Sequence, residues 1–375
     1  MKTILKSKQN SNVLGITLRP EDELILCCAR AKLEDETVQR IKDLIQEDFD
    51  WQYFIKKAGF HRVIPLVYPN LNNIAKGIIP NNIFDKISLA FHNNVNRTLL
   101  LSGELIKILR LLNERGIAAV PYKGPALSAL LYGNVALRPA GDLDIVVQKE
   151  HVFKFKHLLA PYGYEPVDKV TNAEEIAYLE DKRKHTYSLI NKSKDALIEI
   201  HWRITPEYTS PIETKHFWGK LEPFVFNCTK ISTLSLEDWL PILCVHASRH
   251  RWERLNWLCD IADLIRVQPK INWDSVIQLT HQLDCQRMLF LGLYLAHNLL
   301  EVNLPVEVLQ KIEADKESVA LAYGICQEIF TDNQPKFLAK TIYHIRIKQR
   351  WQNKFLYFQS FIRWLITPNK EEHSH

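Results

Sequence analysis

The chain has 375 residues, of which 46% are hydrophobic, so it is long enough to form two or three domains with packed cores. Its 48 Lys and Arg residues are nearly balanced by 43 Asp and Glu residues, and the net charge of +5 predicts no strong overall attraction for nucleic acid. No apolar run reaches the roughly 18 residues of a membrane span, and the first residues, MKTILK, lack the apolar stretch of a signal peptide. We therefore expect a soluble protein, and the seven cysteines, which show no disulfide or metal-site spacing, are typical of a reducing cytoplasm.

The first hundred residues have the pattern of packed helices. Residues 1–19 are polar and are expected to be loose, whereas apolar residues recur every three or four positions after Pro20. This spacing predicts helices that start near residues 20, 36, 51 and 80, and a separate long helix over 97–112 that Gly116 closes.

The middle of the chain changes to the pattern of a small sheet. Residues 117–122 form a short apolar run that predicts a buried strand, and Lys123 and Gly124 follow it. Pro125 then occupies the first position of a predicted helix, where its missing N–H costs nothing. Gly124 permits a sharp turn, and the free amides of the helix start, together with the Lys123 ammonium, are suited to bind phosphate.

Two carboxylates lie close together on the next predicted strand, over 142–147. Asp142 and Asp144 are two residues apart, so in an extended chain they point to the same face while Leu143 points to the core. Like charges held this close repel each other unless a cation lies between them, and Mg²⁺ is the cation that prefers oxygen ligands and phosphate. The pair therefore predicts phosphoryl or nucleotidyl transfer. A solvated strand face is the alternative interpretation of the two aspartates.

A further pair of strands is predicted over 185–190 and 196–202, after a helix over 150–162. The second of these alternates apolar and polar residues, and it places Glu199 and His201 on one side. His185 begins the preceding strand and could lie beside them. A solvent-facing glutamate and a hydrogen-bonded, half-buried histidine are the alternatives for this strand.

The run from Lys123-Gly124 through Arg138 to Gly141-Asp142-Leu143-Asp144-Ile145-Val146-Val147 resembles the nucleotidyltransferase (DNA polymerase β-like) superfamily. More narrowly, it is similar to a group of bacterial, uncharacterised nucleotidyltransferase-family proteins, and the likeness extends from about residue 51 to 305. The chain departs from the superfamily pattern at Pro125, where Ser or Gly is usual, and Lys123 is the candidate to replace the lost phosphate contact.

The resemblance implies roles for the residues quoted. Asp142, Asp144 and Glu199 would form the catalytic metal site for Mg²⁺ or Mn²⁺, and Glu199 would activate the attacking group. Lys123, Gly124 and Arg138 would bind the nucleotide, with ATP or another NTP as substrate. Arg138 could equally serve as an ion-pair partner of Asp142. His185, His201 and His246 are candidates for the acceptor cleft.

From residue 234 the pattern is helical again, and Ser235 is a plausible helix cap. His246, Arg249 and His250 either face the cleft or lie at the surface and end of a helix. The spacing of His246, His250 and Asp260 matches no zinc-ligand pattern. Basic and aromatic residues interleave between residues 336 and 364, for which we expect an amphipathic helix with its aromatic face on the body rather than a nucleic-acid or membrane contact.

These patterns together predict an α+β fold that is dominated by helices: a small mixed sheet in a nucleotidyltransferase core over 99–228, flanked by helical regions over 1–98 and 229–375. The predicted function is Mg-dependent transfer of an NMP from an NTP to a small molecule, a peptide or a protein, with release of pyrophosphate. The alternatives are a catalytically inactive binding module and an RNA-directed nucleotidyltransferase, which the near-balanced charge disfavours.

Overall fold

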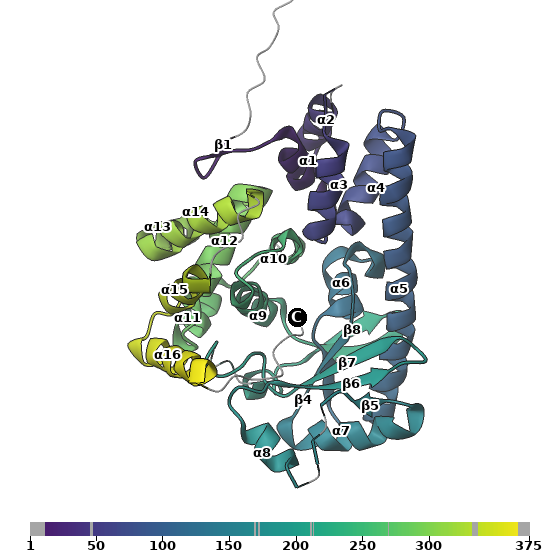
Figure 1. Cartoon of the computed structure of the whole chain (residues 1–375), viewed down its shortest axis with the longest axis vertical. Helices are drawn as coiled ribbons and strands as arrows, with labels where there is room; N and C mark the ends of the chain where they lie inside the picture. Colours follow the sequence, from purple (N-terminus) through teal and green to yellow (C-terminus); the bar gives the residue numbers. More distant parts are fainter. Residues whose placement is uncertain are drawn as a thin grey trace, which may run out of the picture.

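The computed structural model describes residues 12–45, 48–168, 170–171, 173–210, 212, 214–268, 270–331 and 337–366. Helices dominate, and the strands belong to one five-stranded sheet and two hairpins (Figure 1). The predicted α+β class, with a mixed sheet between helical regions, is confirmed. Within the described residues, no helix has both the length and the apolar character needed to cross a bilayer.

Four short helices form the N-terminal part of the fold, at the top of Figure 1. They are α1 (Pro20–Cys28), α2 (Asp35–Leu44), α3 (Trp51–Phe60) and α4 (Ile64–Ala75). Before them, β1 (Asn12–Val13) and β2 (Ile16–Thr17) pair in a small hairpin, in a segment that was expected to be loose. Residues 1–11 of that segment lie outside the described residues.

Helix α5 (Asn81–Glu114) is a single helix of 34 residues that replaces the two helices expected from the sequence. The expected break coincided with an asparagine-rich stretch of poor helix formers, but contacts to other elements hold this stretch helical. Asn94 donates to the carbonyl of Ala136 at 2.8 Å, and Arg97 donates to the carbonyl of Gly141 at 2.9 Å. The helix therefore runs through the predicted boundary at residues 98 and 99.

The main sheet has the strand order β3-β4-β7-β6-β5. Only the β4–β7 pair is parallel, whereas the β3–β4, β7–β6 and β6–β5 pairs are antiparallel. The strands are β3 (Ala119–Pro121), β4 (Leu143–Val147), β5 (Glu165–Pro166), β6 (Thr186–Asn191) and β7 (Ala196–His201). The central strands lie within a residue or two of the predicted ranges.

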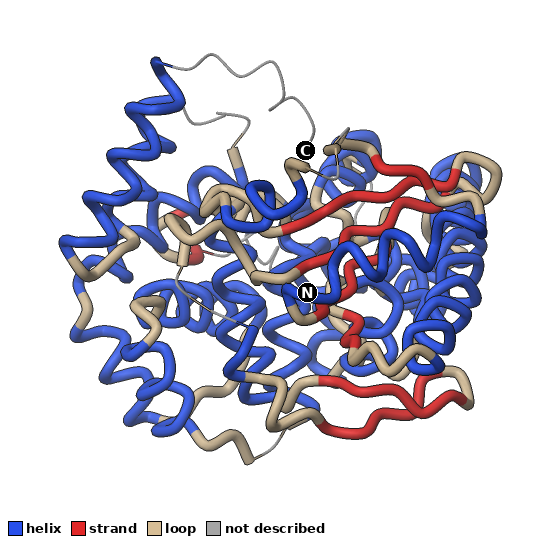
Figure 2. Tube along the Cα trace, turned by 90° about the horizontal axis from the view of Figure 1, so that it is seen from below, coloured by secondary structure: helices blue, strands red, loops and turns tan. Residues whose placement is uncertain are grey.

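The two faces of this sheet have different chemistry. One face carries Leu143, Ile145, Ile198 and Ile200, which pack in a core shared with α5 and α7 (Val152–Leu159). On the opposite face β4 and β7 carry polar residues, because alternate side chains of a strand point to opposite sides. Helices α5 and α7 cover the first face (Figure 1), and Figure 2 shows the strands, in red, with helices packed beside them. The polar residues of β4 and β7 therefore face away from this core.

The C-terminal part contains a hairpin and a second set of helices. The hairpin was not predicted and consists of β8 (Glu222–Phe226) and β9 (Thr229–Thr233). The remaining helices are α6 (Gly124–Tyr132), α8 (Glu175–Glu180), α9 (Leu236–Arg249), α10 (Leu255–Val267), α11 (Trp273–Gln282), α12 (Gln286–Leu300), α13 (Val306–Ala314), α14 (Lys316–Phe330), α15 (Phe337–Arg346) and α16 (Trp351–Ile366).

The expectation for the basic and aromatic C-terminal segment was wrong in one respect. Tyr343 on α15 is buried, but Trp351, Phe355 and Phe358 on α16 are 71%, 52% and 48% exposed, so the aromatic residues of α16 do not pack fully on the body. Lys336 and the side chains of residues 363 and 364 lie outside the described part of this segment.

The N-terminal and C-terminal helices share one hydrophobic core. It includes Leu24 of α1, Leu71 of α4, Leu240 of α9 and Leu293 of α12. The second core lies between the main sheet, α5 and α7. The division at residues 98 and 228 stays a prediction, and packing joins the two outer parts that it separates.

Candidate functional site

The parallel pairing of β4 with β7 brings the predicted acidic residues together. Asp144 is in register with Glu199, and Val146 is in register with His201. Asp144, Glu199 and His201 each offer a ligand atom within 4.8 Å of the others'. Among the described residues this is the one group of three or more such side chains with that geometry.

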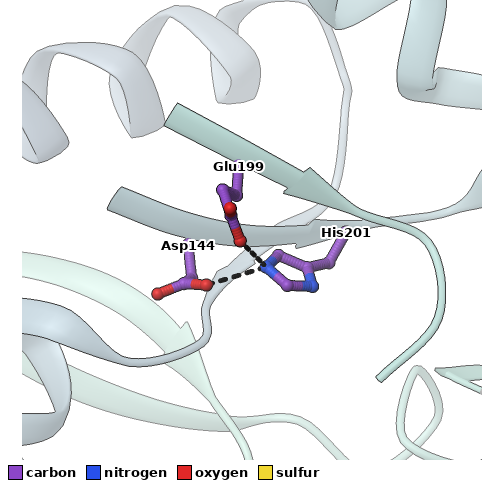
Figure 3. Close-up of side chains that lie close together, drawn as sticks. All are labelled: Asp144, Glu199 and His201. Carbon is purple, nitrogen blue, oxygen red and sulfur yellow. Dashed lines mark hydrogen bonds and ion pairs between the residues drawn. The ribbon is translucent and has the colours of Figure 1, made fainter. Parts of the chain in front are cut away.

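Asp144 is the centre of this group. His201 Nε2 lies 2.8 Å from Asp144 Oδ1 and 3.4 Å from Glu199 Oε2, and Figure 3 shows both carboxylates directed at that nitrogen. Lys123 Nζ also donates to Asp144 Oδ1, at 3.0 Å. Asp144 and His201 are only 4% and 2% exposed, so the contacts lie in a water-poor environment where charge interactions are strong.

These contacts set the protonation of the group. Burial would raise the pKa of Asp144, but Lys123 and His201 outweigh it and hold that pKa well below its usual range. Burial likewise opposes the charged forms of Lys123 and His201, yet Asp144 raises the pKa of Lys123, and the hydrogen bonds to Asp144 and Glu199 raise the pKa of His201. Lys123 and His201 thus partly neutralise the buried carboxylates.

Asp142 lies one residue before β4 and is not part of the three-residue group. The site nevertheless changes its protonation: the charge of Asp144, followed by burial, raises the pKa of Asp142 to about 6. The predicted repulsion between the two aspartates is therefore present, and Lys123 relieves it only in part. A divalent cation shared by the two carboxylates would remove it.

The turn at Gly124 follows the backbone geometry expected from the sequence. Gly124 has a φ of +56°, and a Cβ there would lie 3.4 Å from the carbonyl oxygen of Asp142. Only glycine adopts this conformation without strain, so the turn brings the start of α6 against the Asp142 backbone. Pro125 is within the first turn of α6, as predicted. The Lys123 ammonium, which was expected to bind phosphate, donates to Asp144 in this structure.

Arg138 has a partner that the sequence did not indicate. Its Nε donates to Asp260 Oδ2 at 2.9 Å, and the Tyr132 hydroxyl donates to Asp260 Oδ1 at the same distance. The ion-pair partner of Arg138 is thus Asp260 of α10 and not Asp142, so that alternative was wrong. Arg138 is 7% and Asp260 1% exposed, and together they fasten the segment before β4 to the helical region.

The three candidate histidines lie in different surroundings. His185 is close to His201, with ring centroids 5.9 Å apart, and its Nε2 accepts from Arg249 at 2.9 Å. Burial, and then the charges of Arg249, His201 and Lys123, lower the pKa of His185 well below its usual value. His246 instead packs with His250 and Trp257, at ring distances of 4.9 and 5.5 Å. The structure thus joins His185 and Arg249 to the acidic group.

The donor set of this site fits a divalent metal. The buried carboxylate of Asp144, the half-buried carboxylate of Glu199 and the imidazole of His201 lie within reach of one ion, and the repulsion at Asp142 beside them is relieved only in part. Carboxylate oxygens suit Mg²⁺ and Mn²⁺, and Mn²⁺ also accepts an imidazole nitrogen. The residues present can hold either ion.

Comparisons with known proteins identify a family for most of the chain. Residues 47–301 match the family model described as uncharacterised nucleotidyltransferase. No curated protein matches the chain. Two solved structures are similar at low identity. The solution structure of the antibiotic-resistance factor ANT(2'')-Ia shares 14% identity, with a TM-score of 0.33, over 50% of this chain and 91% of that one. A nucleotidyltransferase-like protein from Paracoccidioides brasiliensis shares 16% identity, with a TM-score of 0.31, over 48% of this chain and 88% of that one.

Proposed function

Because the chain belongs to the uncharacterised nucleotidyltransferase family, we propose that it transfers an NMP from an NTP to an acceptor and releases pyrophosphate. The observation that carries the proposal is the convergence of Asp144 and Glu199, from two parallel strands, beside Lys123 and the start of α6. Paired carboxylates that can hold a divalent metal, next to a helix start that can bind phosphate, are an arrangement suited to nucleotidyl transfer.

In this proposal Asp142, Asp144 and Glu199 hold Mg²⁺ or Mn²⁺. The metal, when bound, neutralises charge on the phosphates and makes the acceptor oxygen a better nucleophile. His201 hydrogen-bonds both Asp144 and Glu199, so it positions the two carboxylates relative to each other. Asp142 contributes the charge that is least compensated by the protein.

Lys123 has two roles in succession. Without nucleotide it pairs with Asp144, and this contact keeps the ammonium beside the turn at Gly124. With an NTP present its ammonium binds the β- and γ-phosphates together with the free amides at the start of α6. Arg138 contributes only through N–H groups other than Nε, because Nε is held by Asp260.

The proposed chemical step is a displacement at the α-phosphorus of the NTP. The acceptor oxygen forms a bond to the α-phosphorus, the bond between that phosphorus and the bridging oxygen to the β-phosphate breaks, and pyrophosphate leaves. The proton of the acceptor passes to the Glu199 carboxylate, which is ionised because its hydrogen bond to His201 lowers its pKa against the effect of burial. His185 and Arg249 lie on the acceptor side of this group.

The acceptor is proposed to be a small molecule, a peptide or a protein, with RNA as a less favoured alternative. All seven cysteines are free and six of them are buried, which suits a reducing compartment, so we place the reaction in the cytoplasm. The catalytically inactive binding module remains the competing function.

The test is NMP transfer by the full-length protein. Each NTP, labelled at the α-phosphate, is incubated with Mg²⁺ or Mn²⁺ and with separate pools of metabolites, proteins and RNA, and label transfer and pyrophosphate are measured. Asp144→Asn should reduce transfer by at least ~10³-fold while the circular dichroism spectrum is unchanged, because it removes a charge and keeps the shape. Asp274→Asn, at an exposed aspartate of α11, is the matched control and should be fully active.

The pools separate the hypotheses. Label in RNA alone would replace the small-molecule or protein acceptor with the RNA alternative. NTP binding without transfer into any pool would favour the inactive binding module. Transfer that survives Asp144→Asn would refute metal-assisted catalysis at this site.

A further inference from the structure

A second polar cavity lies one side chain away from the acidic group. It has a volume of about 180 Å³, and its lining includes Ser248 and Arg249 at the end of α9, His344 of α15, Lys348 after α15, and Tyr208 and Tyr357. Figure 1 shows α9 between the main sheet and helices α15 and α16. We call this space the Arg249–Lys348 cavity.

Arg249 connects this cavity to the site. Its NH1 group donates to His185 Nε2 at 2.9 Å, and the His185 ring lies 5.9 Å from the His201 ring, which in turn contacts Asp144 and Glu199. The side chains of His185 and His201 therefore separate a ligand on the other N–H groups of Arg249 from the carboxylates, and an acceptor would have to extend past them to reach Asp144 and Glu199. The cavity is on the His185 side of the group, whereas Lys123 approaches Asp144 from the turn at Gly124.

The cavity contains two cations without an acidic partner. Within the described residues, no carboxylate lies within ion-pair distance of the Arg249 guanidinium or of Lys348 Nζ. Lys348 is 3% exposed, and its ammonium donates to the carbonyl of Thr209 at 2.7 Å, which satisfies one of its three donors. Asp284, whose charge does act on Lys348, accepts instead from the Arg350 backbone N–H and the Asn353 amide.

Burying an unpaired cation is unfavourable, so such a site is expected to take an anion. Burial lowers the pKa of Lys348 to about 8, against the charge of Asp284, and a bound anion would favour its ammonium form. One further fact agrees with a positive potential in the cavity. Burial, followed by the charges of Lys348, Arg251, Arg249 and Lys340, lowers the pKa of His344 to about 3.

We propose that the Arg249–Lys348 cavity binds one anionic group of the acceptor, a phosphate or a carboxylate, and thereby directs the acceptor nucleophile to the Asp144–Glu199 site. The inference rests on the proposed function and adds the acceptor class. Arg249 and Lys348 supply charge-assisted hydrogen bonds, and the tyrosines and His344 enclose the group. A polycationic acceptor would be repelled by the same two side chains.

Inorganic phosphate is the probe for the first experiment, with the full-length protein at constant ionic strength and without metal. Its dissociation constant is measured by isothermal titration calorimetry. Lys348→Met should weaken phosphate binding at least ~10-fold, because a charged hydrogen bond is lost. Arg249→Gln should act in the same direction, and Lys348→Arg, which keeps the charge, should retain most of the affinity.

The controls separate this cavity from the nucleotide site. Lys311→Met removes an exposed charge from α13, and it should leave phosphate binding unchanged. Asp144→Asn should abolish NMP transfer and leave phosphate binding intact, so the two proposals fail independently. Equal binding by wild type and Lys348→Met would overturn the proposal. So would binding that is lost in Lys123→Ala and kept in Lys348→Met, because the phosphate would then report the triphosphate site.

A second experiment tests the acceptor class directly. Metabolite and peptide pools are separated by ion exchange before the transfer assay. The labelled product should arise from the anionic fraction and should decrease at least ~10-fold in Lys348→Met, with NTP binding unchanged. A product that arises from the cationic fraction would overturn the inference while leaving nucleotidyl transfer established.

Discussion

At the residue scale, Asp144 is the shared partner of Lys123 and His201. A single carboxylate oxygen accepts from both, so Lys123 and His201 compensate the charge of Asp144. In the proposed function, a metal and a nucleotide would replace part of this compensation. That exchange would be favourable only if Lys123 gained a new anionic partner as it left Asp144, so binding of the metal would be coupled to binding of the triphosphate.

Lys123→Ala tests that coupling. NTP affinity should fall about 10–100-fold, the value of one charge-assisted contact, whereas affinity for the nucleoside without phosphates should hardly change. Lys107→Ala, at an exposed lysine of α5, is the control. Fluorescence titration in the presence of Mg²⁺ measures both affinities. An equal loss for NTP and nucleoside would assign Lys123 a structural role instead.

Arg138→Met should destabilise the protein by about 3–5 kcal/mol, because it leaves Asp260 as an unpaired buried charge. The free energy of unfolding in urea measures this loss. Asp260→Asn added to Arg138→Met should recover a large part of it, since the charge is then gone. Lys311→Met breaks the exposed pair with Asp274 and should change stability by less than about 1 kcal/mol. If Arg138→Met and Lys311→Met lost similar amounts of stability, the burial of the Arg138–Asp260 pair would not determine the loss.

At the element scale, the central strands could be predicted because each carries a strong local signal. The apolar run of β4 and the alternation of β7 are visible in the sequence, and Asp142, Asp144 and Glu199 lie on or beside them. The hairpin β8–β9 was missed because its turn, Asn227-Cys228, adopts positive φ angles of 44° and 61° without the glycine that usually announces such a turn. The partners of Arg138 and Arg249 were missed because they lie more than sixty residues away, where no local pattern can point to them.

The first turn of helix α1 contains three consecutive acidic residues after Pro20, and their burial makes the stability of the fold depend on pH. Asp22 is 3% exposed, and burial raises its pKa to about 6, although it accepts from the Tyr53 hydroxyl. A carboxyl with a raised pKa in the folded state favours folding when protonated, below about pH 4, and its contribution is lost as the pH rises through 6. Asp22 therefore destabilises the fold at neutral pH.

Asp22→Asn should remove this effect. It should raise the free energy of unfolding by about 1–3 kcal/mol at pH 7.5, and the gain should shrink toward zero near pH 4. Urea unfolding at several pH values measures the difference between the two proteins. Asp35→Asn, in the first turn of α2 but exposed, should show no such dependence. A gain that is the same at all pH values would mean that the Asp22 charge is not its source.

At the scale of the whole molecule, the core that joins α1 and α4 to α9 and α12 makes the two outer parts of the chain dependent on each other. The acidic site lies on the sheet, but Arg138 and Arg249 connect its margins to α10 and α9. The helical regions supply the partner of Arg138 and most of the lining of the proposed acceptor cavity. A change in the packing of these helices should therefore also change the geometry of the site.

Gly292→Ala tests whether the shared core unfolds as one unit. Gly292 lies on α12, where an added Cβ would meet the Trp252 ring at 2.6 Å and Cys244 Sγ at 2.9 Å, so the methyl group forces α9 and α12 apart. Overpacking of this kind costs about 1–3 kcal/mol. Because α1 and α4 share the core, amide exchange should accelerate in them as well as in α9 and α12. Gly103→Ala is the matched control: its Cβ has open space in α5, and the better helix former should stabilise by about 0.5–1 kcal/mol. Faster exchange confined to α9 and α12 would mean that the N-terminal helices fold as an independent unit, as the boundary predicted at residue 98 implies.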